Sequence, residues 1–354
     1  MNEYIFNTQT ADLLLDKFHE LKKEIAKVIV GQDEVVNLLL TAIFCEGHCL
    51  LVGVPGLAKT LLIHTIAQTL SLNFNRIQFT PDLMPSDILG SETLDKDRNL
   101  KFVKGAIFAN IILADEINRT PPKTQSALLE AMQEYCVTTG GQTYKLDRPF
   151  FVLATQNPIE QEGTYPLPEA QLDRFMFNLT LDYPSYKSEV EIVRNMSVRN
   201  SVQINPILSI EEIRLFQAMV KSKDIVVPDN VVEFAVQLVH ATRPNTELAS
   251  PTANQYLDWG AGPRASQYLI LAAKCHCLLS GEKEYSPNEA DVIAVAKPIL
   301  RHRIVRNFKA EAEGMTTDKI IDKLITEISA KRKRYSSFAF AQRHGFYRRS
   351  TYGI

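Results

Sequence analysis

Residues 51–60 read LVGVPGLAKT and have the spacing of a phosphate-binding loop. In the usual pattern, G-x-x-x-x-G-K-[ST], backbone N–H groups surround the phosphates, the lysine reaches the outer phosphates and the hydroxyl holds Mg²⁺. Gly53, Lys59 and Thr60 occupy three of the four positions, after a short apolar run that predicts a strand. The amphipathic segment that begins at Lys59 predicts a helix, whose N-terminus favours anions. The stretch therefore predicts a nucleotide site.

The fourth position departs from the pattern, because Ala58 stands where the loop usually has glycine. A left-handed backbone would cost alanine about 1–2 kcal/mol there. A negative φ would cost nothing, and alanine would then favour the first turn of the helix. We therefore expect a negative φ at Ala58. A plain strand–turn–helix without a ligand is the alternative that this stretch alone leaves open.

Two carboxylates end the apolar run IILADE, at Asp115 and Glu116. The run predicts a buried strand, and ligands of open α/β sheets bind at the carboxyl ends of the strands. In that position Asp115 can hold the water shell of Mg²⁺, and Glu116 can orient or deprotonate an attacking water. Solvated acids at a strand end are common, but their position after the loop in the same alternating pattern favours the chemical role.

Three further residues have ordinary interpretations when each motif is taken alone. Asn157, in ATQNP, follows an apolar strand, where its amide could position a water or simply form an Asx-Pro turn. Arg174, in EAQLDRF, and Arg264, in GAGPRAS, could both be solvated surface arginines. Taken singly, none of the three predicts a catalytic role.

The elements that must position these groups alternate between strand and helix in the first half of the chain. Apolar runs predict strands at 49–54, 75–80, 106–116, 149–158 and 175–184. Helical periodicity predicts helices at 9–27, 31–44, 59–70 and 123–135. Residues 81–105 look irregular, and Gly140-Gly141 predicts a hairpin over 136–146. The alternation implies a parallel sheet with helices on both faces.

The second half of the chain has a different pattern. After Pro184 we expect only helices, at 186–197, 209–222, 228–242, 263–280 and 287–300. A separate all-helical domain should therefore begin near residues 184–187.

Composition limits the class of protein. The chain has 354 residues and a net charge of −2, which argues against a molecule that binds polyanions through its overall charge. No apolar run approaches the roughly 20 residues that a membrane helix needs. The N-terminus lacks the pattern of a secretory signal. We therefore expect a cytoplasmic protein with no membrane insertion.

In their order along the chain, these motifs resemble those of the MoxR family of AAA+ ATPases, over roughly residues 10–328. The motifs are GVPGLAKT, IILADEINR, ATQNP, EAQLDRF and GAGPRAS. The family shows the same alanine before the loop lysine, which favours a tolerated change. The resemblance implies an α/β fold with an αβα P-loop NTPase domain and parallel sheet in residues 1–185. An all-helical lid domain in residues 186–330 and a basic tail in 331–354 would follow.

The resemblance also implies Mg²⁺-dependent ATP hydrolysis, with ATP and Mg²⁺ as cofactors. Lys59 and Thr60 would be the Walker A pair, and Asp115 and Glu116 the Walker B pair, with Thr60 and Asp115 as the metal ligands. The nucleotide would be bound by Val30, Gly31, Gln32, Gly53, Val54, Pro55, Gly56, Leu57, Ala58, Lys59, Thr60 and Leu61.

The remaining motif residues imply an assembly. Asn157 would be sensor 1, Arg174 an arginine finger that acts on a neighbouring subunit's nucleotide, and Arg264 the sensor 2 arginine. MoxR proteins resemble the helix-2-insert branch of AAA+, in which residues 81–105 would be the insert and 136–148 the later hairpin. The resemblance thus implies a homo-oligomeric ring of six subunits.

Several functions stay open on the sequence. The family implies a chaperone-like remodeller that activates a partner complex, often with a protein carrying a von Willebrand A domain. A nucleic-acid-dependent motor and a metal-chelatase motor subunit are the alternatives, although acids dilute the positive charge of the insert. The tail, residues 331–354, has seven Lys or Arg residues and no acid. It could be solvated, or contact nucleic acid, an acidic partner or a neighbouring subunit.

Overall fold

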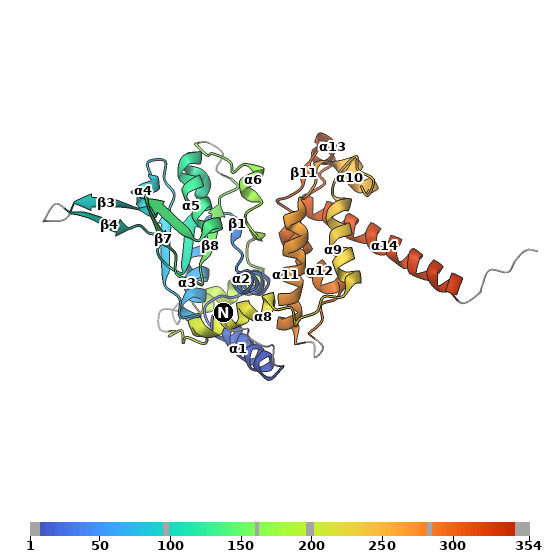
Figure 1. Cartoon of the computed structure of the whole chain (residues 1–354), viewed down its shortest axis with the longest axis horizontal. Coiled ribbons are helices and arrows are strands. Elements are labelled where there is room, and N and C mark those ends of the chain that lie inside the picture. Colours follow the sequence, from blue (N-terminus) through green and yellow to red (C-terminus); the bar gives the residue numbers. More distant parts are fainter. Residues whose placement is uncertain (1–7, 95–98, 160–162, 196–201, 282–284, 344–354) are drawn as a thin grey trace, which may run out of the picture.

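The computed structural model describes residues 8–94, 99–159, 163–195, 202–281 and 285–343. Figure 1 shows an α/β part, which contains the main sheet, beside a part built of helices. The predicted fold class, an α/β domain with a parallel sheet followed by a mainly helical domain, is confirmed. Among the described residues, none of the helices combines the length and apolar composition that a membrane span requires.

The main sheet has five strands in the order β2-β5-β8-β1-β9, and every neighbouring pair is parallel. The strands are β1 (Cys49–Gly53), β2 (Phe74–Gln78), β5 (Ile111–Asp115), β8 (Phe151–Gln156) and β9 (Phe177–Leu181). The third predicted strand, over 106–116, starts later than expected, because residues 106–110 form turns and bends before β5. Since all strands run the same way, their carboxyl ends share one edge of the sheet.

Successive side chains of each strand contribute to two different hydrophobic clusters. In β5, Ile111 and Leu113 belong to one cluster, whereas Ile112 and Ala114 belong to the other. Both faces are therefore covered, as expected for a parallel sheet. The first cluster includes residues of α2 (Asp33–Phe44) and α3 (Lys59–Thr69) and continues into helices of the second part, α9 (Asp229–Ala241), α11 (Pro263–Ser280) and α12 (Glu289–Leu300), so the two parts share a core. The second cluster includes residues of α5 (Pro122–Glu134).

The helices of the α/β part agree with the sequence pattern at most positions. They are α1 (Thr8–Ala26), α2 (Asp33–Phe44), α3 (Lys59–Thr69), α4 (Pro85–Leu89), η1 (Ile117–Arg119), α5 (Pro122–Glu134) and α6 (Glu169–Leu172).

The segment predicted to be irregular, 81–105, instead contains α4 and a hairpin, so that prediction is wrong. Its strands are β3 (Gly90–Leu94) and β4 (Leu100–Lys104), which pair antiparallel. They lack apolar alternation because both faces are largely exposed. The hairpin projects from the α/β part (Figure 1).

A second hairpin follows where Gly140-Gly141 predicts it, with β6 (Cys136–Thr139) and β7 (Gln142–Lys145). The Phe102 ring of the first hairpin stacks on the Tyr144 ring of the second, with centroids 4.0 Å apart. The two hairpins are therefore in contact.

The second part contains all five predicted helices and several elements that were not predicted. The helices are α7 (Tyr186–Arg194), α8 (Ile210–Lys221), α9 (Asp229–Ala241), α10 (Pro251–Tyr256), α11 (Pro263–Ser280), α12 (Glu289–Leu300), α13 (Phe308–Ala312) and α14 (Thr317–Arg343). A short antiparallel pair, β10 (Leu257–Trp259) and β11 (Val305–Arg306), corrects the expectation of helices alone.

Two expectations concern the limits of this part. The helix α8 packs on α2 of the α/β part through the stacked rings of Phe216 and Phe44, 4.4 Å between centroids. Because α8 contacts both parts, the domain boundary near 184–187 stays a prediction. The helix α14 covers residues 331–343 of the basic tail, and the rest of the tail, 344–354, lies outside the described residues.

Candidate functional site

The phosphate-binding loop connects β1 to α3 at the carboxyl edge of the sheet. Ala58 has φ +57° and ψ 29°, so the predicted negative φ is wrong. The residue caps α3 in a left-handed conformation, with its carbonyl accepting the Leu62 N–H at 2.9 Å. Gly56 also has positive φ, +84°. The loop thus bends twice before the helix begins, and alanine bears a strain of about 1–2 kcal/mol.

Lys59 begins α3 and folds back over the loop, where its ammonium donates a hydrogen bond to the Gly53 carbonyl. Half-burial lowers the pKa of Lys59, and the charges of Asp115 and Glu116 partly oppose that shift. Gly53 itself is tightly placed, since an added Cβ would lie 2.9 Å from the carbonyl oxygen of Leu181 in β9. The loop therefore needs glycine at this position.

Asp115 is held by one residue from each neighbouring strand. Its Oδ1 accepts a 2.6 Å hydrogen bond from the Thr155 hydroxyl of β8. Its Oδ2 accepts from Arg76 of β2, also at 2.6 Å. These contacts fix the carboxylate at the edge of the sheet.

Glu116 follows β5 in a left-handed conformation, φ +57°. Its N–H donates to the Thr155 hydroxyl at 2.9 Å, and its carboxylate accepts from Gln78 at 2.9 Å and from Arg119 at 3.0 Å. Arg76, Gln78 and Thr155 were missed by the sequence reasoning. Their positions at the ends of strands beside β5 were the only available signal.

Asn157 is 7% exposed and follows β8. Its Oδ1 accepts the Ile159 N–H at 3.1 Å, which is the local turn that the sequence left open. Asn157 also lines the same cavity as Lys59 and the two acids. Both interpretations of this residue are therefore compatible with its geometry.

The residues of these motifs enclose one cavity of about 490 Å³ at the carboxyl edge of the sheet. This cavity, which we call the phosphate cavity, is lined by Pro55, Gly56, Leu57, Ala58, Lys59, Thr60, Leu61, Arg76, Asp115, Glu116 and Asn157. Loop N–H groups and a lysine suit phosphates, and the hydroxyl and carboxylates are the hard oxygen ligands that Mg²⁺ prefers. The donor set fits a magnesium-bound triphosphate.

A second cavity of about 380 Å³ shares the loop residues 55–58 and extends over apolar side chains. Val30 and Gln32 line it, together with Ile192 and Val193 of α7. The Oε1 atom of Gln32 is buried and has no hydrogen-bond partner among the described residues, so it could accept from a ligand. The chemistry fits a planar base with an amino group.

Gly31 brings the α7 helix close to this cavity. It has φ +75°, and an added Cβ would lie 2.5 Å from the Ser188 hydroxyl oxygen. Gly31, Gly53 and Val54 line neither cavity, although each lies next to a residue that does or within the loop. The predicted nucleotide-binding residues thus lie around two adjoining cavities.

Arg174 and Arg264 do not line these cavities. They meet in another, of about 150 Å³, with Glu46, His48, Met132, Gln133, Tyr135 and Tyr268. Arg174 donates to the Leu129 carbonyl at 2.8 Å, and Arg264 pairs with Asp173 at 3.0 Å. We call this set the arginine pocket. Burial lowers the pKa of His48 to about 4, against smaller opposing effects of the Met132 carbonyl and Glu46.

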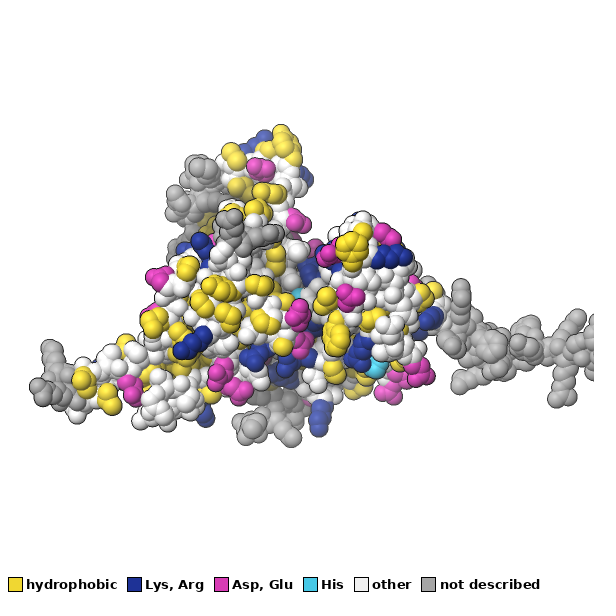
Figure 2. Space-filling model, turned by 90° about the horizontal axis from the view of Figure 1, so that it is seen from above, with side chains coloured by type: hydrophobic (Ala, Val, Ile, Leu, Met, Phe, Trp, Pro, Cys, Tyr) yellow, Lys and Arg dark blue, Asp and Glu magenta, His cyan; other side chains and the backbone are white. Residues whose placement is uncertain are grey.

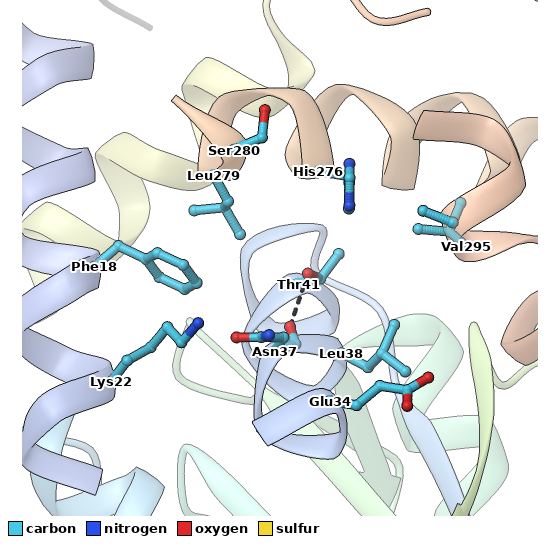
Figure 3. A pocket seen from close by; sticks show the side chains of 11 residues that line it. Phe18, Lys22, Glu34, Asn37, Leu38, Thr41, His276, Leu279, Ser280 and Val295 are labelled. Atoms are coloured by element: carbon cyan, nitrogen blue, oxygen red, sulfur yellow. Dashed lines mark hydrogen bonds between the residues drawn. The ribbon is translucent and has the colours of Figure 1, made fainter. Parts of the chain in front are cut away.

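One more cavity, of about 220 Å³, lies between the helices of the two parts (Figure 3). Phe18, Asn37 and Thr41 face it from α1 and α2, and His276 faces it from α11 (Figure 3). The Thr41 hydroxyl donates to the Asn37 carbonyl at 2.8 Å. None of the predicted site residues lines this cavity, so it is separate from the phosphate cavity.

Comparisons with known proteins agree with this architecture. A family model described as "ATPase family associated with various cellular activities (AAA)" matches residues 48–177, and one described as "AAA lid domain" matches 249–324. Chaperone MoxR1 of Mycobacterium tuberculosis is 41% identical over 323 residues, which cover 90% of this chain and 84% of the relative. The uncharacterized protein YeaC of Bacillus subtilis is 39% identical, with 88% and 94% covered.

A solved crystal structure of a protein from Cytophaga hutchinsonii is similar as well. It superimposes with a TM-score of 0.83 at 43% sequence identity, and the match covers 90% of this chain and 96% of that chain.

Proposed function

This chain belongs to the MoxR family of AAA+ ATPases and is an ATPase, and we propose that it hydrolyses ATP as one subunit of a chaperone-like ring. The observation that carries the proposal is the phosphate cavity. Lys59 and Thr60 of the loop face the acids Asp115 and Glu116 and the amide of Asn157 across it.

The residues of the phosphate cavity have different roles in hydrolysis. The loop N–H groups and Lys59 bind the phosphates, because they present positive charge at a helix N-terminus. Mg²⁺ held by Thr60 and Asp115 would neutralise charge on the outer phosphates. Glu116 orients and deprotonates the attacking water, and Asn157 helps to place that water. Gln32, in the adjoining cavity, would accept a hydrogen bond from the amino group of the adenine base.

Arg174 and Arg264 supply positive charge to the nucleotide of a neighbouring subunit. They line a different cavity from the chain's own Lys59, which supports action in trans. Because both lie in one pocket, Arg264 would serve the same neighbouring nucleotide as Arg174. An arginine finger typically contributes about 10³–10⁵ in kcat, so an isolated subunit should be nearly inactive. We propose a ring of six subunits, which the resemblance to the family supports.

The test is hydrolysis of ATP by wild type, Glu116→Gln and Arg174→Ala, alone and mixed, over a range of protein concentrations. We expect both variants to be inactive alone and partly active when mixed, because mixed rings contain interfaces with one intact acid and one intact arginine. Specific activity of wild type should rise with concentration as rings assemble.

A matched control is Arg214→Ala, which removes an exposed arginine of α8 that lies in neither site. It should hydrolyse ATP as wild type does. If Arg174→Ala by itself is as active as wild type, the role of Arg174 in trans is wrong.

The chaperone-like role rests on relatives and on the two hairpins. One relative is named a chaperone, and the β3–β4 hairpin projects from the α/β part with Leu94 and Leu100 about two-thirds exposed. Exposed apolar side chains on a projecting hairpin suit contact with another protein. We propose a partner that carries a von Willebrand A domain, which should raise the ATPase rate of wild type.

The same assay separates the alternatives. Figure 2 shows Lys and Arg side chains interspersed with Asp and Glu on the face seen from above. That mixture argues against a continuous path for nucleic acid on this face. DNA that raises the ATPase rate, where the protein partner has no effect, would favour the nucleic-acid motor instead.

A further inference from the structure

The turn after α12 binds the segment that carries Arg174. Arg303 lies there with its side chain 2% exposed, and its guanidinium uses all five N–H donors. Nε donates to Asp173 Oδ1 at 2.7 Å, and Nη2 donates to the carbonyls of Asp173 at 2.9 Å and Phe175 at 2.7 Å. Nη1 donates to the carbonyls of Met176, at 3.2 Å, and Ile299.

The two residues before Arg303 bind the same stretch of chain. Arg301 donates to the Asn178 carbonyl at 2.9 Å and pairs with Asp318 through two hydrogen bonds, of 3.0 and 2.7 Å. His302 Nε2 lies 3.1 Å from the Phe175 carbonyl, and burial holds its pKa well below the ordinary value, so the neutral ring donates. We call residues 301–303 the lid clamp.

Asp173 connects the clamp to the second arginine of the arginine pocket. Its Oδ1 binds Arg303, while its Oδ2 binds Arg264 at 3.0 Å. The Arg303 guanidinium also lies over the Tyr268 ring, 5.2 Å from its centroid, and Tyr268 lines the arginine pocket. Arg174 is the next residue after Asp173, so the clamp fixes the backbone on both sides of it.

We propose that Arg303 is a positioning residue for ATP hydrolysis, which holds Arg174 and Arg264 as one unit attached to the lid. This inference rests on the proposed action of both arginines on a neighbouring nucleotide. A movement of the lid would displace both arginines together, because the clamp and Asp173 bridge the two parts. Hydrolysis in one subunit therefore depends on the lid position of the next.

The chemistry of Arg303 favours positioning over simple adhesion of the lid. Well-packed apolar side chains would hold two surfaces together at least as well as a buried ion pair. A guanidinium instead fixes direction, because its planar fork binds several acceptors at set angles. Lysine lacks that fork, so Arg303→Lys keeps the charge and loses the geometry.

The test is ATP hydrolysis by Arg303→Lys, alone and mixed with Glu116→Gln. Alone, kcat should fall by about 10²-fold, since a displacement near 1 Å can have an effect of that size. The KM for ATP should stay within about twofold, because the variant's own phosphate cavity is intact. Mixing should restore activity, because Glu116→Gln subunits still offer a correctly placed Arg174. A merely structural defect in the variant would not be rescued by mixing.

Arg306→Lys is the matched control, since Arg306 lies in the same region and binds the Met315 carbonyl and Glu311 within the lid. It should behave as wild type alone. Thermal melting of each variant shows whether it is folded at the assay temperature. Should Arg303→Lys be unfolded there, Asp173→Asn, which breaks the bridge between Arg303 and Arg264, takes its place in the same mixtures.

Each outcome decides the inference. Restored activity in the mixture supports it. If mixing restores Arg174→Ala but not Arg303→Lys, the clamp does not act through Arg174 and the inference is overturned, while the proposed function stands. Wild-type activity of Arg303→Lys alone also overturns it. If neither mixture is active, action in trans is wrong and the inference fails with it.

Discussion

The phosphate cavity and the arginine pocket are built in different ways. The phosphate cavity takes its polar groups from β2, from the ends of β5 and β8, and from the start of α3 after the loop, all at one edge of one sheet. The arginine pocket takes Glu46 and Tyr135 from the α/β part and Arg264 and Tyr268 from the lid. The first depends on strand ends that pairing fixes, and the second on how two parts pack.

The two sites also differ in how their charges are balanced. In the phosphate cavity, Lys59 faces two acids that belong to the chemistry. In the arginine pocket, Arg264 is paired with Asp173, which Arg303 in turn holds from a buried position. We therefore expect substitutions in the cavity to affect activity far more than stability, and substitutions around Asp173 to affect both.

The largest expected effect is on activity at the phosphate cavity. Lys59→Met should lower kcat by on the order of 10³-fold, because one preorganised cationic donor is lost. Stability should change little, since burial already disfavours the charged form of Lys59. The measurements are steady-state hydrolysis and thermal melting, with the exposed Lys123→Met as control. Activity of Lys59→Met within tenfold of wild type would contradict the assignment.

The next largest effect is on stability, and it compares the buried Arg303 with the partly exposed Arg264. Arg303→Leu should lower the free energy of unfolding by about 3–5 kcal/mol, because it leaves buried acceptors and Asp173 without their partner. Arg264→Leu should cost about 1 kcal/mol or less, because its pair with Asp173 is partly exposed. Urea unfolding monitored by circular dichroism measures both. Equal losses would show that burial does not distinguish the two pairs.

A pH effect should arise at the arginine pocket through His48. Its pKa is about 4 in the folded chain and about 6.5 when unfolded, so between these values only the unfolded state binds the proton. Stability should therefore fall by about 3 kcal/mol as the pH is lowered from 6.5 to 4. His48→Gln should remove that part of the slope. His302, whose pKa is also lowered, is present in both proteins, so its contribution cancels in the comparison.

Urea unfolding of wild type and His48→Gln at several pH values makes this measurement. If the unfolding free energies of the two proteins change in parallel between pH 6.5 and 4, His48 takes up its proton equally in the folded and the unfolded chain. The lowered pKa of His48 would then be wrong.

The smallest expected effect concerns the loop. Ala58→Gly relieves about 1–2 kcal/mol of left-handed strain. It also adds about 0.5–1 kcal/mol of chain entropy to the unfolded state. The net gain in unfolding free energy should therefore be about 1 kcal/mol or less, with hydrolysis nearly unchanged. Ala58→Val, whose branched side chain suits positive φ least, should instead destabilise. A more stable valine variant would argue against left-handed geometry in solution.

Sequence reasoning predicted best where a single segment carries its own pattern. Apolar runs gave all five strands of the main sheet, and the helices α2, α3 and α5 begin within two residues of their expected starts. The predictions failed where the local sequence carried no pattern, or where the rest of the fold imposed a conformation that the local residue disfavours. The insert over 81–105 forms a hairpin whose exposed strands carry no apolar alternation. Ala58 adopts positive φ because the loop must turn before α3.

For the site, the sequence identified most of the functional groups, and the structure showed which other residues contact them. Lys59, Asp115 and Asn157 meet in one cavity, as strand order in a parallel sheet allows. Arg76 and Thr155, which hold Asp115, carry no motif, because any residue that follows the strand pattern could stand there.

The sequence by itself determined the loop, the acids at a strand end and the alternation that makes a parallel sheet, because hydrogen-bonded geometry within short segments sets these features. Only the tertiary structure decided that Arg174 and Arg264 share a pocket, and that Arg303 binds the backbone on both sides of Arg174. Those contacts join residues about 90 to 130 positions apart, from Asp173 to Arg264 and Arg303. They exist because the lid buries apolar surface against the sheet domain, and no local pattern encodes which side chains that burial brings together.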